Sequence, residues 1–390
     1  MRLSTRIRRV KPSATLAINA KAQELRAKGM KVTSLAVGEP DFATPVHVKE
    51  AAKAAIDQDF TKYTAEAGIP ELRRAVAGYF KQFYGATAPM EAVTVTNGGK
   101  QSLYNLFQVL LEPGDEVLIP APYWLSYPDM VLLADGVPVI VPTDPQADFL
   151  ATVEDLERKL TAKTRALILN SPSNPTGCHY GQARLLDMAE WARSKGIFVV
   201  SDEIYDQLVF APALPASLSP WWEKNPECCA VVNGLAKSFA MTGWRVGYTL
   251  AHPDLIKAMN TLQGQSTSNV CSPAQKAALA ALTGPWDFPA AMRAAFLRRR
   301  DLAMEIVGTW PGVVCPKPEG AFYLFPSVAA RFGAAVADST AMCARILEEA
   351  QVALVPGAAF GDDRCLRFSY AVSDDVLADA LIRVGKVLAG

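Results

Sequence analysis

Seven short apolar runs, rich in β-branched residues, lie between residues 92 and 250, and helical patterns such as 101–111 and 182–194 separate several of them. Apolar strands that alternate with helices are typical of a largely parallel sheet with helices on both faces. Ligands of such sheets bind at the carboxyl ends of the strands, so the loops that follow the runs are the places to look for function. The sequence therefore predicts an α/β fold with strands at residues 92–96, 116–119, 137–141, 166–169, 197–200, 230–232 and 246–250.

The loop after the sixth run carries a lysine and an arginine within the stretch VVNGLAKSFAMTGWRVGY, residues 231–248. Lys237 stands at a strand end in apolar surroundings, where lost hydration should lower its pKa. A neutral lysine amine attacks carbonyl groups and forms Schiff bases. Arg245 offers a planar fork of donors suited to a phosphate. Together they indicate an aldehyde cofactor with a phosphate, which describes pyridoxal 5'-phosphate (PLP); a solvated surface lysine is the alternative.

Two further strand-end loops carry polar residues with restricted surroundings. In SPSNPTG, residues 171–177, two prolines hold Asn174 in place, which suits a side chain that presents an amide donor. Asp202 follows the apolar run 197–200, where a buried carboxylate needs a cationic partner. A protonated pyridine nitrogen would serve, and a salt bridge to an arginine is the alternative.

Glycines and a tryptophan mark three other loops. Gly98 and Gly99, followed by Lys100, open a helix whose N-terminal N–H groups favour an anion, although the P-loop spacing is absent. Trp124 could stack on a flat ring or belong to the core. Gly38, before Glu-Pro, fits either a tight turn where the backbone comes close to another group or an ordinary strand-ending turn.

The last quarter of the chain has a different pattern. A charged helix is expected at 288–308, where Arg298-Arg299-Arg300 predicts a solvated or salt-bridged face. Arg367 lies within an apolar strand, residues 365–370, and an arginine there needs a partner. A substrate carboxylate bound by two hydrogen bonds and a structural ion pair are the two candidates.

The overall balance of the 390 residues narrows the class of protein. Thirty-nine basic and 39 acidic residues give a formal net charge of zero, which argues against a nucleic-acid or anionic-membrane partner. Seven scattered cysteines indicate reduced thiols in a cytoplasmic protein. No apolar run reaches the roughly 20 residues of a membrane span. The first 15 residues, rich in Arg and Ser, are interpreted as a mobile arm.

Taken in order, these motifs resemble the class I aminotransferases, PLP enzymes of fold type I, over nearly the whole chain. The resemblance is strongest to a bacterial aspartate aminotransferase branch that opens with KPSAT, here residues 11–15. That branch also carries GEPDF, TKY, GIPELR and AMTGWR, all present in this chain, and some of its members transaminate prephenate. The residues that carry the resemblance are Gly38, Gly98-Gly99-Lys100, Trp124, Asn174-Pro175-Thr176-Gly177, Asp202-Glu203-Ile204-Tyr205, Lys237, Arg245 and Arg367.

The resemblance implies a large PLP-binding domain over residues 46–287, with a mostly parallel mixed sheet covered by helices. A smaller α+β domain would comprise 16–45 and 288–390, and residues 1–15 would form an N-terminal arm. It further implies a cytoplasmic homodimer whose active sites are shared across the interface. The reaction would be transfer of the amino group from L-aspartate to 2-oxoglutarate by a ping-pong mechanism, with prephenate or aromatic 2-oxo acids as further substrates and no metal.

Roles toward the cofactor follow from the same resemblance. Lys237 would hold PLP as a Schiff base, be released by the substrate amine, and then move the proton between Cα and C4′. Asp202 would keep the pyridine nitrogen protonated, while Asn174 and Tyr205 would bond the ring hydroxyl oxygen. Trp124 would stack on the ring. The phosphate would be held by Gly99, Lys100 and Arg245, and by Tyr63 from the neighbouring subunit.

Substrate roles are implied in the same way. Arg367 would clamp the α-carboxylate, with Gly38, Asn174 and Trp124 beside it, and Lys100 would bind the distal carboxylate. The arm residues Lys11, Ser13 and Thr15 would close over that end. One departure stands out: many relatives have a serine where this chain has Ala236, and some have a phosphate-contacting serine in place of Gly234. The phosphate would then be held by fewer side chains.

Two other functions are compatible with this fold. A PLP-dependent C–S β-lyase is one, because fold alone does not fix the reaction, but Lys100 and the KPSAT arm favour a dicarboxylate substrate. A non-catalytic PLP-fold module of a transcription regulator is the other. It would need an added DNA-binding domain, for which this chain has no spare length or basic segment.

Overall fold

The computed structural model describes residues 1–12, 14–334 and 336–390. A seven-stranded sheet lies at its centre, in the order β2-β8-β7-β6-β5-β3-β4. Strands β7, β6, β5, β3 and β4 run parallel, whereas β8 is antiparallel to both β2 and β7. The predicted mostly parallel mixed sheet is therefore confirmed. Its strands are β2 (Val93–Thr96), β3 (Glu116–Pro120), β4 (Val137–Val141), β5 (Thr164–Asn170), β6 (Phe198–Asp202), β7 (Cys229–Gly234) and β8 (Gly247–Leu250).

Both faces of this sheet are buried. Successive side chains of each strand point to opposite sides, so each strand contributes to two hydrophobic cores. In β5, Leu167 and Leu169 pack into one core, and Ala166 and Ile168 pack into the other. The first core is completed by α4 (Pro70–Tyr84), α8 (Gly181–Ser194), α9 (Ser219–Lys224) and α12 (Ser272–Thr283). The second is completed by α5 (Gly99–Leu110), α6 (Ser126–Leu133) and α11 (Pro253–Gly264). Helices α3 (Val46–Asp57) and α7 (Val153–Glu157) pack against α12 and α8.

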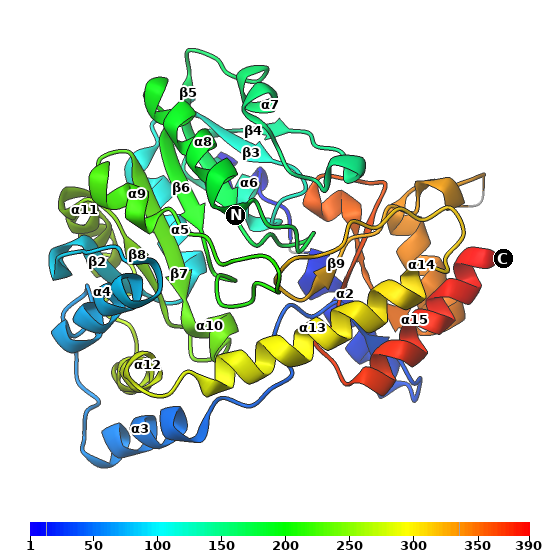
Figure 1. The fold of residues 1–390 in the computed structure, drawn as a ribbon, viewed down its shortest axis with the longest axis horizontal. Coiled ribbons are helices and arrows are strands. Elements are labelled where there is room, and N and C mark those ends of the chain that lie inside the picture. Colours follow the sequence, from blue (N-terminus) through cyan, green and yellow to red (C-terminus); the bar gives the residue numbers. More distant parts are fainter. Residues whose placement is uncertain (13, 335) are drawn as a thin grey trace.

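A further hydrophobic core lies beside the large sheet and is built mostly from the C-terminal quarter. The long helix α13 (Asp287–Val307) connects the two parts in Figure 1. It packs against α15 (Asp374–Ala389) and shares a hydrophobic core with α14 (Ser339–Ala350) and the sheet β11-β12-β9 (Val355–Pro356, Leu366–Ser369 and Tyr323–Leu324). Strand β1 (Thr33–Ser34), which follows α2 (Ala14–Ala27), pairs with β10 (Val352–Ala353). Tyr205, Leu208 and Phe210 also join this core, so it continues up to the edge of the strand-end loops.

The arginines of α13 differ from one another. Arg299 is buried, with N–O distances of 2.7 and 2.9 Å to the two carboxylate oxygens of Asp41 and 3.2 Å to Asp374. Arg300 is also buried and pairs with Asp301 at 2.7 Å. A solvated face is therefore wrong for these two, and the salt-bridged alternative is confirmed. Through Asp41, Arg299 connects α13 to the segment that contains Gly38.

The N-terminal residues have more structure than the sequence predicts. A short helix, α1 (Thr5–Arg8), precedes α2, and Arg6 pairs with Asp135 after α6 at 2.7 Å. Arg9 binds the same carboxylate. In the part of the chain that the structure describes, no helix has the length and apolarity needed to cross a membrane.

Candidate active site

A cavity of about 700 Å³ opens at the carboxyl ends of the sheet strands, where the strand-end rule places a ligand. Loops after β2, β3, β5, β6 and β7 contribute to its lining, as do the 37–39 segment and two residues from the smaller sheet. It brings together eleven of the residues singled out from sequence: Thr15, Gly38, Gly99, Lys100, Trp124, Asn174, Asp202, Tyr205, Lys237, Arg245 and Arg367.

Lys237 lies on a single turn of helix, α10 (Leu235–Ser238), directly after β7. Its side chain is half-buried, and Nζ donates a hydrogen bond to the backbone oxygen of Gly38. Burial lowers the pKa of this amine to about 8; Glu39 opposes the shift, while Arg367 and Arg245 add to it. The surface-lysine interpretation is wrong. At pH 8, about half of such an amine is neutral and nucleophilic.

Asp202 ends β6 and is buried. Its carboxylate accepts the hydroxyl of Tyr127 at 2.6 Å and the backbone N–H of Ile204 at 3.3 Å. Burial raises the pKa of Asp202 to about 6, against the opposing effect of the Tyr127 hydrogen bond. No cation among the described residues forms an ion pair with it, so the arginine salt bridge expected as the alternative is wrong. The site holds a buried carboxylate that can accept a cationic ligand atom.

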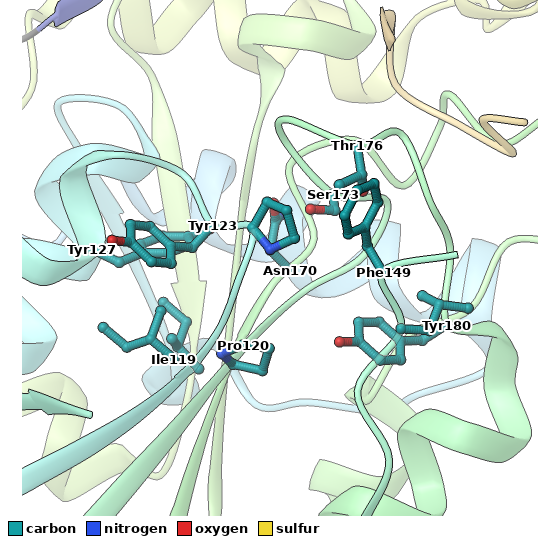
Figure 2. A pocket seen from close by; sticks show the side chains of 12 residues that line it. Ile119, Pro120, Tyr123, Tyr127, Phe149, Asn170, Ser173, Thr176 and Tyr180 are labelled. Atoms are coloured by element: carbon teal, nitrogen blue, oxygen red, sulfur yellow. The ribbon is translucent and has the colours of Figure 1, made fainter. Parts of the chain in front are cut away.

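Tyr127 was not singled out from the sequence, because it contacts Asp202 from 75 residues away. Behind it lies a second, much smaller cavity of about 20 Å³. Figure 2 shows Tyr127 on one side of this cavity, Phe149 and Tyr180 on the other, and Asn170 and Ser173 between them. Such a volume suits a single water molecule, so this small cavity cannot hold a cofactor or a substrate.

Arg367, on β12, is 2% exposed. Nη1 donates to Oδ1 of Asn174 at 3.0 Å, and Nη2 donates to the backbone oxygen of Ala36 at 2.6 Å. Its Nε is buried and has no hydrogen-bond partner among the described residues. No described carboxylate pairs with it, so the structural ion pair is wrong. A buried guanidinium with an unused donor suits a ligand carboxylate.

Asn174 and Tyr205 are both fixed by neighbours. Since Oδ1 of Asn174 accepts from Arg367, its side-chain NH₂ group is left as the donor predicted for this position. The Tyr205 hydroxyl lies 2.9 Å from that of Tyr323, a residue whose part in the site the sequence did not indicate. A Cβ on Gly38 would lie 2.7 Å from the Tyr323 hydroxyl oxygen, so the close approach predicted at Gly38 is confirmed.

The N-terminus of α5 forms a cationic cradle with Arg245. Gly98 has a φ of 82°, and a Cβ there would lie 2.5 Å from Nη2 of Arg245. Arg245 is exposed and donates to the backbone oxygens of Thr242 at 2.8 Å and Asn97 at 3.3 Å, with no ion pair to any described residue. Free helix N–H groups beside an unpaired guanidinium favour a phosphate.

The departure at Gly234 has a packing reason. A Cβ at this position would lie 2.9 Å from the backbone oxygen of Val246 and 3.0 Å from Cα of Gly247. A serine would therefore require β7 and β8 to move apart. The loss of a side-chain hydroxyl is thus tied to the tight pairing of these two strands.

Lys100 and Trp124 form a contact at one side of the cavity, with Nζ 4.9 Å from the ring centroid. Partial burial and the nearby Arg245 lower the pKa of Lys100, although much of the side chain is exposed. Trp124 is half-buried and lines the cavity rather than belonging wholly to the core. An adaptable cation thus lies beside a fixed aromatic wall.

Two predicted residues, Tyr63 and Lys11, do not line this cavity. Tyr63 is 90% exposed on the loop between α3 and α4. Lys11 is exposed and does not line the cavity. Ser13 lies outside the described residues.

The residues of the cavity fit PLP. They provide a buried carboxylate without a cation, a cationic cradle at a helix N-terminus, an aromatic wall and a lysine with a lowered pKa. Among the described residues, no group of three or more His, Cys, Asp or Glu side chains could hold a metal ion.

Comparison with known proteins identifies the family of this chain. Residues 30–384 match the family model "Aminotransferase class I and II". The chain is 48% identical to an aspartate/prephenate aminotransferase of Cereibacter sphaeroides, covering all of this chain and 99% of the relative. It is 45% identical to an aspartate aminotransferase of Geobacillus stearothermophilus, covering 100% and 99%. A solved aspartate aminotransferase of Thermus thermophilus with maleate superposes with a TM-score of 0.93 at 45% identity, covering 99% and 100%. The chain therefore belongs to the class I and II aminotransferases and is a PLP-dependent enzyme.

Proposed function

We propose that the chain transfers the amino group of L-aspartate to 2-oxoglutarate, giving oxaloacetate and L-glutamate in two half-reactions. The observation that carries this proposal is the placement of two cations in one cavity with Lys237. Arg367 is buried and has an unused N–H group, and Lys100 lies at the Trp124 side. Two cations suit the two carboxylates of aspartate and of 2-oxoglutarate. The relatives named as aspartate aminotransferases support the same substrate.

When bound, PLP supplies an electron sink that stabilises negative charge at the substrate Cα. Asp202 would hold the ring nitrogen in its protonated form, and Tyr127 would keep this carboxylate oriented and ionised. Asn174 and Tyr205 would donate to the ring oxygen. Trp124 would cover one face of the ring.

The cradle of Gly98, Gly99 and Arg245 would hold the phosphate. We also propose a homodimer, in which Tyr63 of one subunit reaches the phosphate of the other. Tyr63 is exposed and does not line the cavity of its own chain, which supports this arrangement. The seven free cysteines support a cytoplasmic location. The separate core around α13, α14 and α15 supports the domain division at residues 45/46 and 287/288.

The protein's own steps toward the substrate follow from the contacts. Arg367, held by Asn174 and Ala36, would orient the α-carboxylate and so direct the substrate Cα toward Lys237. Lys237 Nζ, whose pKa is lowered to about 8, would take the proton from the substrate Cα and deliver it to C4′ of the cofactor. The backbone oxygen of Gly38 would hold Nζ between these transfers.

Prephenate or an aromatic 2-oxo acid is proposed as a second substrate. The name of the Cereibacter relative supports this, as does the exposed position of Lys100 beside Trp124, which leaves room for a ring at the distal end. The C–S β-lyase alternative finds no support in the names of the relatives cited above. A single-turnover panel tests the whole assignment, with aspartate, glutamate and phenylalanine added to the PLP form and prephenate added to the aminated form: aspartate and glutamate should react fastest, and a preference for phenylalanine would contradict it.

Lys100→Met should selectively weaken the reaction of dicarboxylate substrates. Methionine keeps the stem against Trp124 but removes the charge. We expect the variant to lose roughly 1–2 kcal/mol of transition-state stabilisation for aspartate, as calculated from the fall in kcat/KM. This value lies between those of exposed and buried charge pairs. Steady-state kinetics with aspartate and phenylalanine measure it, and phenylalanine should lose less. An equal loss on both substrates would refute the assignment of Lys100 to the distal carboxylate.

Loading of the cofactor-free protein should depend on pH through Lys237. Only the neutral amine attacks an aldehyde, and the pKa of Lys237 is lowered to about 8. The rate at which added PLP develops protein-bound absorbance should therefore rise about tenfold per pH unit below 8 and level off above it. A rate that keeps rising to pH 10 would show an ordinary lysine.

A further inference from the structure

Another cavity, of about 210 Å³, lies where α13 begins, close to the end of α4. It is lined by the aromatic side chains of Phe83, Tyr84 and Trp286, by the polar side chains of Gln207 and Arg293, and by Pro215, Pro289 and Ala290. None of its lining residues lines the active-site cavity. Figure 1 shows the start of α13 near α10 and α12, well away from the C-terminal helices.

Arg293 is half-buried at this cavity and has unused donors. Within residues 1–12, 14–334 and 336–390, its only side-chain hydrogen bond is from Nη1 to the backbone oxygen of Gln207 at 3.3 Å, and it forms no ion pair. The three arginines of 298–300 on the same helix differ, because each is paired with an aspartate. A half-buried guanidinium without a carboxylate is suited to receive one from a ligand.

Several side chains that line the cavity are held in place by contacts with residues outside its lining. The Tyr84 hydroxyl donates to Asp206 at 2.8 Å, and Nε2 of Gln207 donates to the Tyr79 hydroxyl at 2.8 Å. The Trp286 ring stacks on Tyr79 with centroids 5.5 Å apart. A cavity with walls held in this way is already formed before binding, which reduces the entropy lost by ordering side chains.

We propose that this cavity is a second binding site, specific for a small aromatic carboxylate. The ring would pack against Phe83, Tyr84 and Trp286, and the carboxylate would take the free N–H groups of Arg293. One ring with a short acidic chain suits the volume. An aliphatic dicarboxylate would leave the aromatic wall uncovered and would have one cation for two charges. The site is independent of the amino-group chemistry proposed above.

The test is titration calorimetry of the PLP-loaded enzyme with phenylacetate as the probe. We expect saturable binding whose Kd rises at least tenfold in Arg293→Gln. Arg298→Gln, a matched change on the same helix outside the cavity, should leave Kd within twofold. Acetate and 2-phenylethanol, which each keep one half of the probe, should bind at least tenfold more weakly. Transamination and cofactor absorbance should stay unchanged in Arg293→Gln, which shows that this variant is folded.

Arg367→Ala separates this cavity from the active site, since phenylacetate could also meet the guanidinium of Arg367. Binding that depends on Arg293 and persists in Arg367→Ala supports the second site. The proposal is overturned if phenylacetate shows no saturable binding, if Arg293→Gln binds it as tightly as the wild type, or if Arg367→Ala alone abolishes binding.

Discussion

Lys237→Ala should abolish transamination, with kcat/KM for aspartate at least about 10⁴-fold below that of the wild type. General acid–base catalysis alone contributes roughly 10²–10⁴-fold, and this variant also loses the only amine among the described lining residues placed next to Gly38 and Arg367. The purified variant should also lose the visible absorbance of the protein-bound cofactor. Stopped assays with aspartate and 2-oxoglutarate, together with an absorption spectrum, measure both effects.

Two matched variants separate the nucleophile from the charge. Lys237→Arg keeps a cation at the same place, but a guanidinium stays protonated at any accessible pH. It should therefore be as inactive as Lys237→Ala. Lys81→Ala, on the exposed side of α4, removes a lysine outside the cavity and should change neither activity nor colour. A Lys237→Ala protein that still transaminates would exclude the mechanism.

Those features of the site that depend on one stretch of chain could be predicted from the sequence. Each of the strands before Asn174, Asp202 and Lys237 is an apolar run that is followed by a polar loop. The α/β pattern therefore predicts these three residues at one edge of the sheet. The sequence also indicated that Gly38 allows close backbone approach. The group that the Gly38 backbone approaches is the hydroxyl of Tyr323. Tyr323 lies 285 residues further along the chain, so no local sequence pattern predicts this contact.

Features that depend on contacts between distant residues could not be predicted. Tyr127 shows no local pattern that marks it as the partner of Asp202, and Tyr323 shows none that marks it as the partner of Tyr205. The sequence left both a solvated and a salt-bridged position open for Arg299 and Arg300. Nothing in α13 itself shows that Asp41 reaches Arg299 from the N-terminal segment. For the same reason the alternatives of an ion pair for Asp202 and for Arg367 could be decided only by the folded structure.

Asp202→Asn should raise the activation free energy by roughly 3–5 kcal/mol, the cost of removing one partner of a buried charge pair, and so lower kcat by about 150- to 5,000-fold. Asparagine has the same shape and can still accept the Tyr127 hydroxyl, so the variant should fold. It lacks the negative charge that would stabilise a protonated ring nitrogen, and no other described residue forms an ion pair at this position. Single-turnover kinetics with aspartate measure the loss, and a kcat within threefold of the wild type would contradict this role.

Tyr127→Phe is the matched control, since it removes the hydrogen bond but leaves the carboxylate. The loss should be about tenfold or less, as expected for one hydrogen bond worth roughly 1–1.5 kcal/mol. Its second effect has a definite sign. The Tyr127 hydroxyl lowers the pKa of Asp202, so its removal raises that pKa above about 6. Because the ionised carboxylate is the form that binds a cation, cofactor affinity of Tyr127→Phe should begin to fall at a higher pH than in the wild type. In Asp202→Asn this part of the pH dependence should be absent, and equilibrium titrations of PLP between pH 5 and 8 distinguish the three proteins.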